Sequence, residues 1–233
     1  MSAATRLRLL TPVLFLVTCV VAIVSRDAID PTVTQQVGKQ SSEGIEATLD
    51  LALTSTLRLE ANVAKLRARY DDFNEVVSGK LVSRAGNTPT GVPEEAANLW
   101  LTWRFLPQWE ADVGLRYVGP RQVDSANSRK IGSYTVADAG VSWQANPSLK
   151  LALRAYNLAD RKYAVSFSNG GNQWLLGRPR SVELIAVDRG PGIVDVPAAL
   201  EGRVPEPGGL GCGLAAVRRA SARFDIWSRR GPS

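Results

Sequence analysis

The sequence predicts an all-β protein, built as an antiparallel up-and-down meander of about eight strands between residues 30 and 189. Two observations predict this fold. Apolar residues alternate with polar or charged ones along successive segments, which is the period of a strand with two different faces. The joints between these segments also alternate strictly between short and long. Tight turns are therefore expected at one edge of the sheet and long loops at the other.

The first strands are expected at Val33–Lys39, Ile45–Leu53 and Leu57–Val63. After Val63 the alternation changes phase, because cationic side chains take the positions that apolar residues held before. Either a β-bulge redirects the strand there, or the strand has left the apolar zone. We favour the second interpretation, because a long polar loop over residues 71–93 follows. The cations that mark the change are Lys65, Arg67 and Arg69.

The remaining strands alternate in the same way. They are expected at Leu99–Phe105, Trp109–Tyr117, Thr135–Gln144, Leu149–Ala155 and Trp174–Val187. The short joints are residues 54–55, 106–108 and 146–148, and the long ones are residues 71–93, 122–132 and 166–173.

Charged residues fall on one side of the alternation, and the other side is apolar. This separation, together with loops sorted by length, is typical of an outer-membrane β-barrel, in which a charge on the lipid side costs about 2–4 kcal/mol at the midplane. We therefore predict that the meander is part of such a barrel, with outer-membrane lipid as a partner. A soluble β-sandwich also alternates, but it has no reason to sort its loops by length. The residues expected to face the lumen are Arg104, Glu110, Asp112, Arg116, Asp138 and Arg154.

Aromatic residues agree with this prediction, because they lie near the ends of the expected strands. An interfacial girdle would occupy that position in a membrane barrel. The residues concerned are Trp103, Phe105, Trp109, Tyr117 and Trp143.

Residues 1–27 resemble an export signal. Arg6 and Arg8 precede a run from Leu9 to Val24 that is apolar apart from Thr11, Pro12 and Thr18, and we expect an apolar helix there. The alternatives are an uncleaved anchor and an accidental apolar start.

Residues 190–233 are rich in glycine, proline and arginine and lack strand periodicity, so a disordered tail is expected. A short basic helix could form at Ala215–Phe224.

Composition excludes several function classes. The chain has no histidine, so Ser-His-Asp and Cys-His catalysis and most zinc sites are excluded. The two cysteines, Cys19 and Cys212, lie outside the repeated pattern and support no disulfide framework. The net charge of +6 comes from charges of mixed sign without a continuous basic stripe, so no nucleic-acid binding is expected. We expect no catalytic residue, no metal, no cofactor and no enzymatic activity.

Two motifs carry a family resemblance. Asn157-Leu-Ala-Asp-Arg-Lys-Tyr163, followed by Gly177-Arg-Pro-Arg-Ser-Val182, resembles the last two strands of TonB-dependent outer-membrane receptors, with Ala159 in place of the usual aromatic residue. Val37–Glu46 and Gly114–Gly119 resemble other parts of the same barrel. The residues that match the family motif, in a structural role, are Asn157, Leu158, Asp160, Tyr163, Gly177, Pro179 and Arg180.

The resemblance implies uptake of ferric siderophores through a 22-stranded barrel that an N-terminal plug blocks and the TonB energy-coupling complex drives. The ending Gly177–Ser181 looks most like the siderophore branch. The long loops would then contribute to the choice of chelate. Arg84, Asn87, Arg129 and Lys130 could meet an anionic chelate, but lysine and arginine in loops are usually solvated, so we name none of them as a site.

The chain departs from the family in having no room for a plug, no energy-coupling box near its start, and a tail after the expected closing strand. We therefore expect a C-terminal barrel segment that is not competent for transport alone, and we hypothesise a receptor gene broken by frameshifts. Two alternatives stay open. One is a small self-closed outer-membrane barrel with a structural or adhesive role, and the other is a soluble β-sheet binding protein.

Overall fold

The structure is a computed structural model that describes residues 8–9, 13–26, 34–168, 172–188, 195–201 and 213–226. The chain divides into two compact units. One comprises Met1–Trp143 with Ala152–Ile185, and the other comprises Gln144–Leu151 with Ala186–Ser233.

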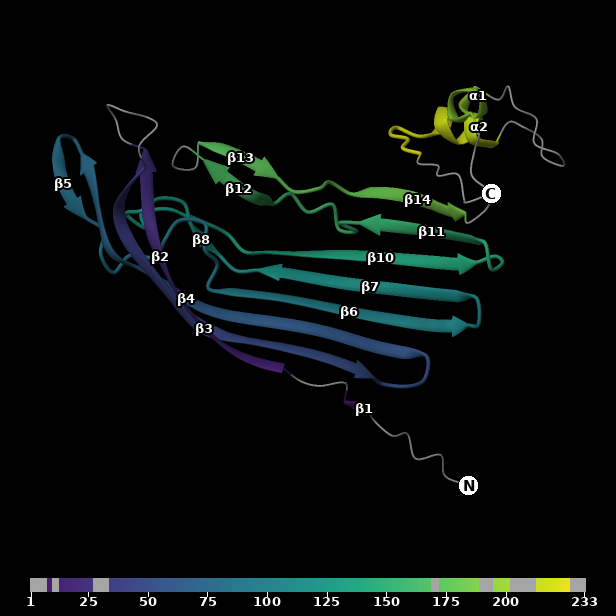
Figure 1. The fold of residues 1–233 in the computed structure, drawn as a ribbon, viewed down its shortest axis with the longest axis horizontal. Coiled ribbons are helices and arrows are strands. Elements are labelled where there is room, and N and C mark those ends of the chain that lie inside the picture. The colour runs from purple at the N-terminus through teal and green to yellow at the C-terminus, as the bar shows by residue number, and fades with distance from the viewer. Residues whose placement is uncertain are drawn as a thin grey trace. The chain divides into compact units, whose positions relative to one another are not determined.

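The predicted antiparallel meander is confirmed. The main sheet has the order β1-β3-β4-β6-β7-β10-β11-β14, and β2 pairs with β3 on the same edge as β1 (Figure 1). From β2 onward, the long strands that follow one another in the chain are thus neighbours in the sheet. The described strands form an open path that ends at β1 and β2 on one side and at β14 on the other, not a closed barrel. Their bounds are β1 Arg8–Leu9, β2 Val13–Arg26, β3 Thr34–Ala52, β4 Leu57–Val77, β6 Glu95–Leu106, β7 Trp109–Val118, β10 Tyr134–Gln144, β11 Leu149–Tyr156 and β14 Ser181–Asp188.

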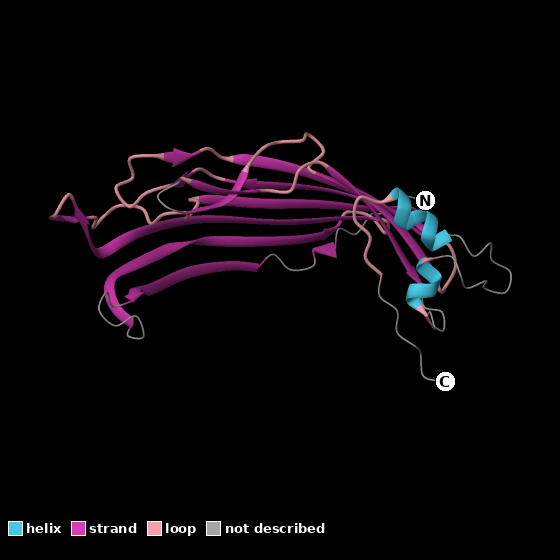
Figure 2. Ribbon diagram, turned by 90° about the horizontal axis from the view of Figure 1, so that it is seen from above, coloured by secondary structure: helices cyan, strands magenta, loops and turns pink. Residues whose placement is uncertain are grey.

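The long joints carry short strands of their own that the sequence did not predict (Figure 2). β5 (Lys80–Ser83) pairs with the far end of β4, β8 (Arg121–Gln122) pairs with β9 (Lys130–Ile131), and β12 (Ala164–Ser168) pairs with β13 (Gln173–Leu176). The single strand expected at Trp174–Val187 was wrong, because it is broken after Leu176 and resumes at Ser181. The β4–β5 turn has φ 51° at Ser78 and 77° at Gly79. Positive φ at both central residues is what a tight hairpin of this type requires.

The change of phase after Val63 does not come from a bulge. The pairing of β4 with β6 runs without a shift from Leu57 to Lys65, and the shift in the β3–β4 ladder lies at Lys39/Gln40 instead. Beyond the change, Ala68 and Tyr70 are buried. The strand therefore continues without a break to Val77, into a region where its other face is covered. The polar loop expected over residues 71–93 was wrong in its first part, because those residues extend β4 and then form a further short strand at Lys80–Ser83. That the strand has left the apolar zone stays a prediction.

The predicted N-terminal apolar helix is wrong. Val13–Arg26 is strand β2, which pairs antiparallel with β3, with Leu16 opposite Ile45. A short run rich in valine and isoleucine has no period that separates a helix from a strand, and β-branched residues favour the strand once an edge can pair with them. Whether residues 1–27 act as an export signal stays a prediction, and most of residues 1–12 lie outside the described part.

The tail after β14 is not wholly irregular. Where the structure describes it, it contains the helices α1 (Val196–Leu200) and α2 (Gly213–Ala220). Asp195 caps α1, because its Oδ1 accepts a hydrogen bond of 3.0 Å from the N–H of Ala198. α2 overlaps the predicted basic helix and carries Arg218 and Arg219 in its last turn. No helix among the described residues has the length and the apolar character to cross a membrane.

The apolar face of the meander is bare. Leu99, Trp103, Val113 and Leu153 are 40%, 52%, 43% and 46% exposed, so no second protein layer covers them in the described chain. Neighbouring strands match apolar residues on this face, such as Leu99 with Leu115. The buried hydrophobic residues lie elsewhere, at the long-loop end. They are Ala68, Tyr70, Val123, Ile131, Tyr134, Val136, Tyr163 and Ala164.

Aromatic side chains form a row across β6, β7 and β10 at their short-turn ends. The ring centroids of Trp103 and Phe105 are 5.5 Å apart, those of Phe105 and Trp109 are 6.2 Å apart, and Trp109 stacks on Trp143 at 5.5 Å. A continuous aromatic row at one end of the strands suits a membrane interface.

Candidate functional site

The predicted polar-face residues come from neighbouring strands, and the structure brings some of them together. Arg104 and Glu110 form an ion pair of 3.7 Å between Nη2 and Oε2. Asp112 lies opposite Gly140, where its carboxylate fills the space a side chain would take, since a Cβ there would be 2.8 Å from Oδ1. Arg154 is half-buried and has no ion pair in the described part of the chain. That these residues face a lumen stays a proposal.

Arg116 and Asp138, by contrast, are engaged with the family motif. Asp138 Oδ1 accepts a hydrogen bond of 2.7 Å from the backbone N–H of Asn157, and Arg116 Nη2 lies 3.4 Å from the hydroxyl of Tyr163. The side chains of Arg116 and Asp138 therefore contact the residues after β11 in addition to forming part of the sheet.

Asn157 is the centre of the motif. It is 1% exposed and has a φ of 50°, a left-handed conformation that asparagine tolerates. Its Nδ2 donates to the carbonyls of Arg161 (2.9 Å) and Arg178 (3.0 Å), and its Oδ1 accepts from the N–H of Arg161 (2.8 Å). One side chain thus joins the end of β11, the loop after it and the segment before β14.

The rest of the motif supports the same connection. Asp160 Oδ1 accepts a hydrogen bond of 3.0 Å from the backbone N–H of Arg180, and the N–H of Leu158 donates to the carbonyl of Ala137 at 2.8 Å. Pro179 and the side chain of Arg180 are exposed, so these two residues take part in the motif through their backbone and not through their side chains.

Tyr163 and Gly177 complete it. The N–H of Gly177 donates to the carbonyl of Tyr163 at 2.8 Å, and a Cβ at Gly177 would overlap the tyrosine ring. The ring is 8% exposed and packs on Tyr134 with centroids 4.4 Å apart. We call these residues the clasp, defined as Asp138, Asn157, Asp160, Tyr163 and Gly177.

Arg178 adds a contact that sequence reasoning missed. Its guanidinium lies 3.8 Å from the ring centroid of Tyr156, and the Tyr156 hydroxyl donates to Glu183 at 3.0 Å. The cation, the ring and the carboxylate connect β11 to β14 beside the clasp. The sequence places Arg178 within Gly177–Ser181 but gave no sign of this contact.

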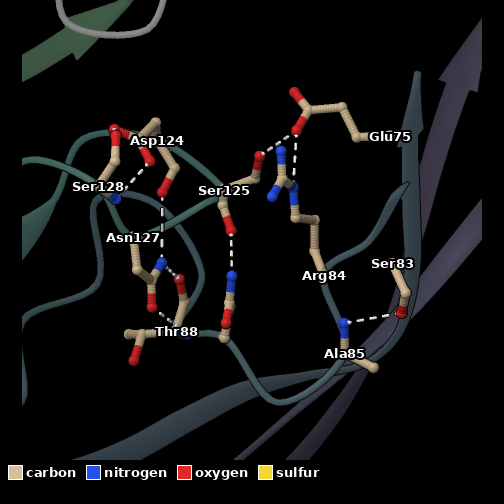
Figure 3. A network of polar contacts seen from close by, with 10 residues as sticks. Glu75, Ser83, Arg84, Ala85, Thr88, Asp124, Ser125, Asn127 and Ser128 are labelled. Carbon is tan, nitrogen blue, oxygen red and sulfur yellow. Dashed lines mark hydrogen bonds and ion pairs between the residues drawn. The ribbon is translucent and has the colours of Figure 1, made fainter. Parts of the chain in front are cut away.

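A second polar network joins the long loops (Figure 3). Glu75 Oε2 accepts from Arg84 Nε at 2.9 Å and from Ser125 Oγ at 2.7 Å, and Asn87 Nδ2 donates to the carbonyl of Ser125 at 2.8 Å. Arg84, whose side chain we expected in solvent, is therefore partly buried and bonded, and so is Asn87. The loop after β5 is held against the loop between β8 and β9.

Asn127 makes a paired contact across the same two loops. Its Oδ1 accepts from the N–H of Thr88 and its Nδ2 donates to the carbonyl of Thr88, both at 2.8 Å (Figure 3). Within its own loop, Asp124 accepts from the N–H and the hydroxyl of Ser128 at 2.9 and 2.8 Å. We call this set, with Glu75, Arg84, Asn87 and Ser125, the loop lock.

The charges of the loop lock are set by these contacts. Hydrogen bonds from Ser125 and Arg84 lower the pKa of Glu75 below its usual value. For Asp124, burial raises the pKa, but the hydrogen bonds from Ser128 and the charge of Arg129 outweigh it, and the net shift is downward. Both groups are carboxylates at neutral pH, so they accept the hydrogen bonds that the loops offer.

Arg121 connects the third long loop, the one that contains β12 and β13, to the other two. It is 6% exposed, and its Nη1 and Nη2 donate to the carbonyls of Val165 (2.8 Å) and Ala164 (2.6 Å) in β12. Val123, Ile131 and Ala164 pack into a small hydrophobic cluster beside it. All three long loops are thus connected at one end of the sheet.

A recess of about 310 Å³ opens at this end, between the β9–β10 connection, the clasp and β13. Among the residues described, no three acidic or cysteine side chains group closely enough to hold a metal ion. The recess is lined by Ile131, Gly132, Ser133, Tyr134, Arg161, Lys162, Tyr163, Ala164, Trp174 and Leu176.

Comparison with known proteins agrees with this architecture. Residues 15–158 match the family model described as TonB dependent receptor-like, beta-barrel. The probable TonB-dependent siderophore receptor PiuA of Acinetobacter baumannii is 31% identical over 143 residues, which are 60% of this chain and 19% of PiuA. The ferrioxamine receptor of Yersinia enterocolitica is 31% identical over 169 residues, which are 69% of this chain and 22% of that receptor.

The fold matches a solved relative as well. The crystal structure of the siderophore receptor PiuA from Acinetobacter baumannii superposes with a TM-score of 0.59 at 27% identity, over 71% of this chain and 24% of that one. The chain spans about a fifth of the length of the curated relatives it matches. The family model covers more than half of the sequence. The chain therefore belongs to the family of TonB-dependent receptor-like β-barrels.

Proposed function

We propose that this chain is a wall segment of a ferric-siderophore receptor, and that its long loops contribute to recognition of the chelate. The observation that carries the proposal is the connected loop end, where the loop lock and Arg121 hold three loops together around a recess. Loops that are already ordered lose less conformational entropy when a ligand binds. The relatives named as siderophore and ferrioxamine receptors point to the same class of ligand.

Members of this family reside in the outer membrane, and so does this chain. The bare apolar face of the meander fits that environment, since its large side chains would lie against hydrocarbon. The relatives are receptors and transporters, not enzymes.

We further propose that the described strands do not form a transport path alone. Their sheet order has open ends at β1 and β2 and at β14. In hydrocarbon each unpaired backbone polar group costs several kcal/mol, so both edges require a pairing partner in a membrane. We propose contact with TonB only for a complete receptor, not for this segment alone.

A binding and uptake experiment separates the two parts. The full chain is expressed in a Gram-negative strain without its own siderophore receptors, and radioiron-labelled hydroxamate and catecholate siderophores are added. We expect saturable binding to isolated outer membranes in the cold and no energy-dependent accumulation of iron in cells. Arg84→Gln, which opens the loop lock, should weaken binding, whereas Arg67→Gln on the exposed part of β4 should not.

Absence of binding for every chelate would contradict the recognition proposal. Accumulation that depends on TonB would contradict the transport proposal.

A further inference from the structure

The recess at the long-loop end is large enough for one chemical group of a ligand, not for a whole chelate. Its volume of about 310 Å³ is at the lower limit of small-molecule pockets. One aromatic ring with its chelating oxygens fits such a space, whereas a whole metal chelate does not. The recess would therefore take one arm of a larger ligand.

The charge of the recess is positive. Arg161 and Lys162 line it and are exposed, their side chains have no ion-pair partner in the described chain, and no Asp or Glu lines it. Lining cations without counter-ions attract an anion, and the low-dielectric walls strengthen that attraction.

Two further cations lie behind the walls. Arg116 reaches the hydroxyl of Tyr163 at 3.4 Å, and Arg121 lies 5.7 Å from the ring centroid of Tyr134. Arg121 is buried, yet its guanidinium donates only to backbone carbonyls and its Nε has no partner in the part of the chain described. A buried cation without a carboxylate leaves net positive charge next to the recess.

The walls are aromatic as well. Tyr134 and Tyr163 pack against each other there, and Trp174, which is 48% exposed, also lines the recess. Aromatic side chains favour a planar aryl group in offset or edge-to-face contact.

We propose that this recess binds one anionic aryl arm of the metal chelate, of the catecholate kind, in preference to a neutral hydroxamate. The inference rests on the proposed function. A trivalent metal held by three catecholate dianions keeps a triple negative charge and presents flat rings. The same metal held by three hydroxamate monoanions is neutral and, in acetohydroxamate, presents no aromatic ring.

The test uses gallium(III) in place of iron(III), because its chelates do not absorb visible light. The full chain in lipid vesicles is titrated with gallium tris-catecholate, tris-oxalate and tris-acetohydroxamate, and binding is followed by tryptophan fluorescence. Oxalate carries the same charge as catecholate without the ring. We expect affinity to fall in the order catecholate, oxalate, acetohydroxamate.

Arg161→Gln with Lys162→Gln should weaken catecholate binding by about five- to tenfold, as expected for two partly exposed cations. The matched control is Arg67→Gln with Lys150→Gln, which removes the same charge from exposed positions of β4 and β11 outside the long loops and should change nothing. Trp174→Phe should abolish most of the fluorescence response, and circular dichroism confirms that each variant keeps its strands.

Equal or tighter binding of acetohydroxamate, or no effect of the Arg161/Lys162 variant, would overturn this inference and leave the proposed function standing. If none of the three chelates binds, the proposed function fails together with it.

Discussion

The ring of Tyr163 occupies the space that a side chain at Gly177 would need. The backbone hydrogen bond of 2.8 Å between these two residues fixes the segment before β14 against the loop after β11. Because the ring is buried against Tyr134, it cannot move aside without losing that packing. The glycine in the Gly177–Ser181 motif is thus required by a close approach, not by its backbone angle.

Gly177→Ala should therefore destabilise the folded chain by about 1–3 kcal/mol, the usual cost of forcing extra volume into a packed site. The measurement is the urea midpoint of the chain in lipid vesicles, followed by tryptophan fluorescence. Gly132→Ala is the control, because a Cβ at Gly132 meets nothing within 4 Å. That variant should change stability by less than about 0.5 kcal/mol. Equal midpoints for the two variants would contradict the steric argument.

Asn157 carries the other half of the clasp, and its side chain and its backbone can be tested separately. Asn157→Gly keeps the positive φ but leaves the part-buried backbone carbonyls of Arg161 and Arg178 without their partner, so we expect the free energy of unfolding to fall by about 1–3 kcal/mol. Asn157→Ala should lower the free energy of unfolding by about 1 kcal/mol more, because alanine tolerates the left-handed conformation poorly. The same urea titration measures both. An unaffected Asn157→Gly variant would show that the amide does not hold the loop.

The sequence was sufficient to predict the strands that alternate. For β6, β7 and β10, the apolar residues define one face and the charged residues the other. The structure then pairs Leu101 with Val113 and Thr102 with Asp112, so neighbouring strands keep the same face apolar. Alternation says which face a residue takes but not what it covers. It gave no sign that the ring of Trp100 lies across Gly114, where a Cβ would be 2.6 Å from the ring.

The loop end could not be predicted for a different reason. Its hydrogen bonds join residues far apart in the chain, such as Asn87 with Ser125 and Glu75 with Ser125, separated by 38 and 50 positions. Polar residues in a long loop look alike whether they are solvated or bonded. The helix prediction for the segment that forms β2 was wrong for another reason. This segment is apolar at nearly every position, so only its pairing with β3 decides its conformation.

The two faces of β6 make a direct test of the membrane environment. Leu101→Arg places a charge on the apolar face and should cost about 2–4 kcal/mol in a bilayer. Thr102→Arg, its neighbour on the other face and opposite Asp112, should cost less than about 1 kcal/mol. Stability is measured by reversible urea unfolding in vesicles. If Leu101→Arg were tolerated as well as Thr102→Arg, the apolar face would not contact lipid.

The loop lock should respond to acid in a defined direction. The pKa of Glu75 and that of Asp124 are lowered in the folded state, so the stability they contribute is present above their usual values near 4.5 and 3.8 and is lost as pH falls below them. We expect the amides of residues 84–91 and 120–129 to exchange slowly at neutral pH, and their protection to drop in acid, after correction for the intrinsic exchange rate. Hydrogen exchange with mass spectrometry measures this.

Glu75→Gln should produce the acid behaviour at neutral pH, because an amide oxygen is a weaker acceptor for the Arg84 guanidinium than a carboxylate is. Glu94→Gln is the control, since that side chain is exposed and has no ion pair in the described chain. Protection of the loops that stays unchanged in Glu75→Gln would mean that the contacts independent of Glu75, such as the paired Asn127–Thr88 contact, hold the loops. Any loss of protection in acid would then come from Asp124.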